Sequence, residues 1–132
     1  MRIAIDTSVL VRILTNKPQP LAAEVISIIE KRIANGDTIV VPNLVLSEAY
    51  YAVQHHYGVD KKSALLALRF LSLQPGFEFS RLAVNILSID GLEHLNPGFV
   101  DRLICGEQEE CNMAILSCEK SFARMSNAEV IP

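Results

Sequence analysis

Short runs with the composition of β-strands alternate with longer helix-like stretches along this 132-residue chain. The expected strands are residues 2–5, 38–41, 77–79, 113–117 and 129–131, and helices are expected over 7–14, 21–34, 44–57, 61–73, 81–94, 97–110 and 120–125. Strands that are separated by helices form parallel βαβ units, with helices covering both faces of the sheet. We therefore predict an α/β fold, a three-layer sandwich in which a central parallel sheet of four or five strands is flanked by helices.

Capping residues mark where several of these helices should begin. Asn43, Asp60 and Ser80 precede helical stretches, and their side-chain oxygens can accept a hydrogen bond from the first turn. Asn96 is a further expected cap, with Pro97 at the first helical position, where no backbone N–H is needed.

The composition is typical of a folded globular chain, with 50% hydrophobic residues and a mean hydropathy of +0.28. The length suits a single domain over residues 1–132. The apolar runs are far too short to cross a bilayer, and Asp6 follows only three apolar positions, which is unlike a signal peptide. We therefore expect a cytoplasmic protein without a membrane partner. The three cysteines are an odd number without CxxC spacing, which argues against a disulfide framework or a zinc site.

The net charge of −3 provides no basic surface of the kind that nucleic-acid-binding proteins usually carry. It does not exclude a nuclease, because part of the acidic excess can belong to a metal site. Without Asp6, Glu48, Asp101 and Glu119, the chain has 12 basic and 11 acidic residues.

These four carboxylates border or interrupt apolar segments, and they are 42, 53 and 18 residues apart. A carboxylate against an apolar core is costly unless something pairs with it. The same segments contain no matching set of Lys or Arg, so a divalent cation is the expected partner, because hard cations take oxygen ligands. Only the fold can bring the four residues together.

Glu48 is the most informative of the four, because its helix is apolar on nearly all sides over residues 44–53, as in a buried helix. At helical spacing it shares a face with Leu44, Tyr51 and His55. A structural hydrogen bond, for example to a tyrosine, is the alternative. We interpret the adjacent Tyr50 and Tyr51 as packing residues rather than as a platform for bases.

Each of the other three carboxylates has a simpler alternative explanation. Asp6 can act as the N-cap of the helix that follows it. Asp101 lies early in its helix, where the helix dipole favours negative charge. Glu119 can be a first-turn acid with Ser117 as its cap.

Four short blocks around these acids resemble the PIN-domain family, and VapC-type toxins in particular. The blocks are Asp6-Thr7-Ser8-Val9-Leu10, Pro42-Asn43-Leu44-Val45-Leu46-Ser47-Glu48, Phe99-Val100-Asp101-Arg102-Leu103-Ile104 and Ile115-Leu116-Ser117-Cys118-Glu119-Lys120-Ser121-Phe122. They occur in the family's order over essentially the whole chain. Two positions depart from the family pattern: Glu119 stands where Asp is usual, and Arg102 replaces a typical Ala.

The resemblance implies a ribonuclease that depends on one or two Mg²⁺ or Mn²⁺ ions. Asp6 and Asp101 would be the primary metal ligands, Glu48 a ligand or general base, and Glu119 a ligand at the second position. A metal ion of this kind lowers the pKa of bound water and neutralises charge on the phosphate. Outside these four, Ser8 and Ser117 would hydrogen-bond ligands or waters. Basic residues expected at the RNA phosphates are Arg12, Arg102 and Lys120, with Lys17 and Arg124 also near in sequence.

The resemblance leaves three functions open. The first is the toxin of a toxin–antitoxin pair, an endoribonuclease that is restrained by a cognate antitoxin and forms a homodimer. The second is a housekeeping PIN nuclease in RNA processing. The third is a degenerate PIN domain that only binds a partner, which retention of all four acids disfavours.

Overall fold

The computed structural model describes all 132 residues and contains five strands, six α-helices and two short 3₁₀ helices. The strands are β1 (Arg2–Ala4), β2 (Thr38–Val40), β3 (Phe77–Glu78), β4 (Ile115–Ser117) and β5 (Ala128–Val130). The helices are α1 (Thr7–Thr15), α2 (Leu21–Ala34), α3 (Asn43–Tyr57), α4 (Lys61–Ser72), α5 (Arg81–Leu87), η1 (Leu92–His94), α6 (Phe99–Glu110) and η2 (Lys120–Arg124). Every predicted strand is present, and the predicted α/β class is confirmed.

All strand pairs are parallel, as the alternation of strands and helices predicts. β1 pairs with β2, and β2 pairs with β3, so these strands form a three-stranded sheet in the order β1-β2-β3. β4 pairs with β5 in a second, two-stranded sheet, with Leu116 opposite Glu129. The five strands thus divide into two sheets instead of forming one central sheet.

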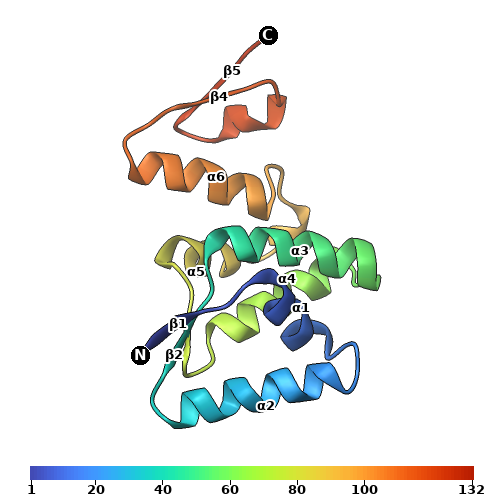
Figure 1. Cartoon of the computed structure of the whole chain (residues 1–132). Coiled ribbons are helices and arrows are strands. Elements are labelled where there is room, and N and C mark those ends of the chain that lie inside the picture. The colour runs from blue at the N-terminus through green and yellow to red at the C-terminus, as the bar shows by residue number, and fades with distance from the viewer.

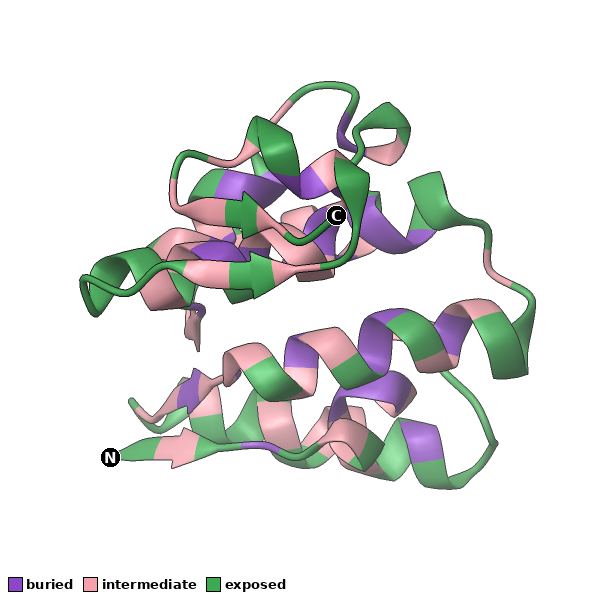
Figure 2. Cartoon of the chain, turned by 90° about the horizontal axis from the view of Figure 1, so that it is seen from above, coloured by how far each residue is buried: buried purple, intermediate pink, exposed green.

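The two sheets lie apart in the molecule. Figure 1 places α2 at one end, the β4–β5 pair at the other end, and α6 next to that pair. The second view also separates the N-terminal strand from the C-terminal strands (Figure 2). One edge of β1 and one edge of β4 are therefore without a strand partner.

Side-chain caps begin three of the six α-helices, and two of the predicted caps need correction. Asp60 and Ser80 act as N-caps, because their side chains accept hydrogen bonds from Ser63 N and Ala83 N at 2.7 and 3.0 Å. Asn43 is instead the first residue of α3, after Pro42. Pro97 lies outside α6, which begins at Phe99 after Gly98.

The hydrophobic core is built mainly from helix residues together with Ile39 of β2. Figure 2 accordingly shows most of the buried segments on helices. Phe99 and Leu103 of α6 are each 1% exposed and belong to this core. α6 also packs closely on α5, because a Cβ atom at Gly106 would lie 2.5 Å from Cδ1 of Leu82. These contacts fix the helix that carries Asp101.

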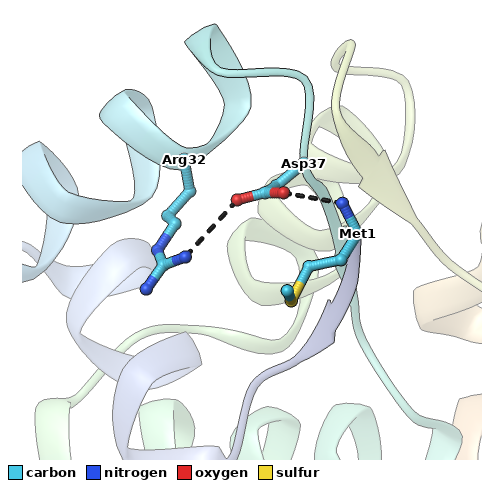
Figure 3. Close-up of polar contacts among 3 residues, drawn as sticks. All are labelled: Met1, Arg32 and Asp37. Atoms are coloured by element: carbon cyan, nitrogen blue, oxygen red, sulfur yellow. Dashed lines mark hydrogen bonds and ion pairs between the residues drawn. The ribbon is translucent and has the colours of Figure 1, made fainter.

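An ionic contact holds the start of β1 against the α2–β2 turn (Figure 3). The N-terminal ammonium group of Met1 donates to Oδ1 of Asp37 at 2.7 Å. Arg32 lies 3.6 Å from the other carboxylate oxygen. Both cations lower the pKa of Asp37, and the hydrogen bond from the ammonium group is the largest cause.

None of the helices has both the length and the hydrophobicity needed to span a bilayer.

Candidate active site

Asp6 caps α1 at the end of β1. Its Oδ1 accepts hydrogen bonds from Ser8 Oγ at 2.6 Å and from the backbone N–H of Val9 at 3.1 Å. These two bonds lower the pKa of Asp6, and the positive charge of Arg12 contributes less. The hydrogen bond from Val9 N–H confirms that Asp6 is the N-cap of α1. The carboxylate is exposed, and its second oxygen accepts no hydrogen bond from the protein.

Glu48 lies on the exposed face of α3, which corrects the expectation of a buried helix. The helix buries Leu46, Ala49, Tyr50 and Val53 against the core. The opposite face is open to solvent: Leu44 is 71% and Tyr51 48% exposed, and Glu48 and His55 are also exposed. The prediction of a buried helix was wrong because this face, although it carries Leu44 and Tyr51, is exposed to solvent together with Glu48.

Asp101 is half-buried in the first turn of α6. Burial raises its pKa, and the negative charge of Glu119 raises it further. Asp101 forms no ion pair with Lys or Arg. No cationic side chain of the protein therefore offsets the burial of this carboxylate.

Glu119 lies at the N-cap position of η2, just beyond β4, and is exposed. Its backbone N–H donates to Ser117 Oγ at 3.0 Å. Ser117 ends β4 and is not the N-cap of η2, so the prediction of Ser117 as the cap was wrong. Glu119 is the one other acid whose charge acts on the pKa of Asp101, and this effect is smaller than that of burial.

One chain does not gather all four predicted ligands. No group of three or more His, Cys, Asp or Glu side chains is arranged to hold a metal ion. Asp6 lies between β1 and α1 and Glu48 lies on α3, whereas Glu119 follows β4 in the separate sheet. The four predicted ligands therefore do not form one metal-binding cluster in this arrangement of the chain.

The arginines among the predicted basic residues already donate hydrogen bonds to backbone oxygens, whereas Lys120 does not. Arg12 donates to the backbone oxygen of Ser8 at 2.9 Å and stays close to Asp6. The Nε atom of Arg102 donates to Pro97 O at 2.7 Å, and Arg124 donates to Asn96 O at 2.5 Å. Lys120 is exposed and forms no ion pair.

A pocket of about 300 Å³ beside Asp101 was missed by the sequence analysis. Its wall includes Tyr51, His55 and Lys61. The rings of Tyr51 and His55 stack with centroids 6.1 Å apart and an interplanar angle of 19°. Only Tyr50 is the packing residue that we expected, because it is buried and meets Phe99 edge-on. The spacing of Glu48, Tyr51 and His55 along one helix face was the available signal.

Comparison with known proteins agrees with this fold. A search of curated proteins finds no match. The family model described as PIN domain matches residues 3–128, nearly the whole chain, and PIN domains are generally nucleases. This match begins within β1, ends at the first residue of β5 and includes all four candidate acids. The chain therefore belongs to the PIN-domain family.

Proposed function

We propose that this chain is a single-domain endoribonuclease that hydrolyses RNA phosphodiester bonds with Mg²⁺ or Mn²⁺. We further propose that it acts in the cytoplasm as the toxin of a toxin–antitoxin pair, as VapC-type proteins do. The nuclease class follows from membership of the PIN-domain family. The observation that supports this site most is Asp101 itself, a half-buried acid beside a pocket of about 300 Å³ that has no Lys or Arg ion-pair partner.

The proposed catalytic and metal-binding residues are Asp6, Glu48, Asp101 and Glu119. Two like charges that share a site raise the pKa of one another unless a cation lies between them. Burial is the main cause of the raised pKa of Asp101, and the negative charge of Glu119 adds to it. A cation that bridges phosphate and carboxylates would need more donors than this pair offers.

Other residues are proposed to support the site. Ser8 holds the Asp6 carboxylate through the hydrogen bond from its hydroxyl group. Ser117 orders the backbone at Glu119. Lys120 is the basic residue best placed for RNA phosphate, because it is exposed, free of ion pairs and adjacent to Glu119. Arg12 and Arg102 are the other proposed contacts, although each already donates to the backbone.

A cleavage assay on total cellular RNA tests the enzyme proposal. The wild-type protein should cleave RNA with Mg²⁺ or Mn²⁺ and stop when EDTA is added. Asp101→Asn should lower the rate at least about 100-fold, as loss of a group that contacts the reacting centre does. Asp90→Asn is the matched control, because the Asp90 side chain is 98% exposed and pairs only with Arg69. Equal rates for both variants, or no cleavage by the wild type, would refute the proposal.

Expression in cells tests the toxin role separately. Induction of the wild-type chain should arrest growth, whereas Asp101→Asn should not. Co-expression of a small reading frame from immediately upstream should restore growth. Normal growth during expression of an active nuclease would favour a housekeeping role in RNA processing.

A further inference from the structure

The pocket of about 300 Å³ beside Asp101 has a rigid aromatic inner wall. Tyr50 of α3 and Phe99 of α6 line it and are 6% and 1% exposed. Their rings meet edge-on with centroids 5.3 Å apart, which holds α3 and α6 together at this point. Sites for small ligands are concave, mostly apolar and aromatic, and contain a few polar groups. This pocket has that character, and its volume lies at the small end of the usual range for such sites.

The outer part of the pocket carries a second pair of rings that stays open to solvent. Tyr51 is 48% exposed, and His55, one turn further along α3, is also exposed. The two rings are nearly parallel, with an interplanar angle of 19° and centroids 6.1 Å apart. Such an offset pair presents a flat aromatic surface at the mouth of the pocket. An isolated contact of this spacing adds only about 0.2–0.5 kcal/mol to a helix, so stability explains little of the exposed pair.

A free cation completes the lining. Lys61, the first residue of α4, borders the same pocket, is exposed and forms no ion pair. The carboxylate of Asp60 already caps this helix by accepting from Ser63 N at 2.7 Å. The ammonium group of Lys61 is therefore the positive group that remains available, and lysine binds phosphate as a point charge.

We propose that this pocket binds one unpaired nucleotide of single-stranded RNA. The base would stack on the Tyr51–His55 pair, and a phosphate next to it would contact Lys61. Bases stack on aromatic side chains whatever their identity, because every base has a π-face. A base within a duplex has both faces covered by its neighbours, so the pocket would select single strands. This inference rests on the proposed function, since it concerns the substrate of the same site.

The pocket lies beside two of the proposed catalytic acids. Asp101 is part of its lining. Glu48 is exposed on α3 three residues before Tyr51, which is about 4.5 Å along the helix axis. A strand that is held on the aromatic pair would therefore pass close to both acids. A side chain of a partner protein is the alternative occupant, but a flat ring pair together with an unpaired ammonium group suits a base and its phosphate better.

Binding of a fluorescent eight-nucleotide single-stranded RNA, measured by anisotropy in EDTA, tests this proposal without cleavage. Tyr51→Leu and His55→Ala should each weaken binding about 5- to 150-fold, the range expected for loss of one stacking contact. Tyr57→Leu and His56→Ala are matched controls, because these residues are also exposed on α3 but lie outside the pocket. Both controls should bind RNA like the wild type. Tyr51→Phe keeps the ring and should also bind like the wild type.

Two further measurements separate the base contact from the phosphate contact. The same RNA in a duplex offers no unpaired base, so Tyr51→Leu should leave its affinity unchanged. Lys61→Ala should reduce the slope of log affinity against log salt concentration by about 0.7, as loss of one phosphate contact does for single strands. Lys62→Ala is the matched control, since Lys62 is the next residue of α4 but borders a different pocket. Its slope should equal that of the wild type.

The proposal is overturned if the Tyr51 and His55 variants, folded as judged by circular dichroism, bind single-stranded RNA as well as their controls. If they also escape restraint by the co-expressed upstream reading frame, the pocket holds a partner protein instead. The ribonuclease function fails or stands separately. Pocket-dependent binding by a wild type that does not cleave RNA would refute the enzyme and keep the nucleotide site. Cleavage with unchanged binding by the pocket variants would do the reverse.

Discussion

Phe99→Ala should destabilise this protein more than any other single aromatic truncation, because Phe99 joins α6 to the core. The side chain is 1% exposed, and its ring meets that of Tyr50 edge-on, with centroids 5.3 Å apart and an interplanar angle of 76°. Removal of a buried phenylalanine side chain costs about 3–5 kcal/mol, which includes the cavity that remains. Within that total, an edge-to-face aromatic pair accounts for about 0.5–1.5 kcal/mol.

Urea denaturation followed by circular dichroism measures this loss. The free energy of unfolding should fall by about 3–5 kcal/mol, and the midpoint of thermal unfolding should fall by roughly 10–20 °C for a domain of this size. Phe70→Ala is the matched control, because Phe70 is 65% exposed on α4. Its effect should stay within about 0.5 kcal/mol.

A double-mutant cycle with Tyr50→Leu isolates the ring contact. The coupling energy between the two positions should be about 0.5–1.5 kcal/mol. If Phe99→Ala costs less than 1 kcal/mol or matches Phe70→Ala, α6 is not anchored in the core as described. Additive effects of the two substitutions would refute the edge-to-face contact alone.

Three further predictions concern a cap, two glycines and two carboxylates. Ser80→Ala should cost about 1 kcal/mol in urea denaturation, because it removes the N-cap of α5. Gly76→Ala should lower the free energy of unfolding by about 1–3 kcal/mol more than Gly36→Ala. Both glycines have positive φ, but only at Gly76 would a Cβ atom clash, 2.5 Å from Cγ2 of Ile33. Equal losses for the two variants would refute this packing. In carboxyl NMR titrations, Asp101 should titrate above the ordinary Asp pKa of about 3.9, and Asp6 below it. The contribution of Asp101 to stability therefore falls as pH rises from about 3.9 to its raised pKa. The contribution of Asp6 is present above about 3.9 and is lost as pH falls through its lowered pKa. Glu119→Gln should lower the pKa of Asp101, and an unchanged pKa would contradict an effect of Glu119 on Asp101.

The sequence alone was sufficient for the fold class and most element boundaries. The period of apolar residues changes between strands and helices, and this signal depends only on neighbours within a few positions. The caps at Asp60 and Ser80 were found for the same reason, since an N-cap bonds to a residue three positions later. Asn43 and Pro97 were misplaced because cap residues and their neighbours carry overlapping local signals. The four motif blocks also sufficed to recognise the PIN family, which the family model confirms.

Exposure and long-range pairing were decided only by the tertiary structure. Nothing local distinguishes a buried apolar helix face from the exposed one that presents Glu48 and Tyr51, because the neighbours of α3 come from distant parts of the chain. Strand order is likewise non-local, since each strand offers the same backbone groups on either edge. The sequence therefore proposed four acids, whereas the tertiary structure determined that Asp101 is half-buried and that Asp6 follows a strand at an open edge of its sheet.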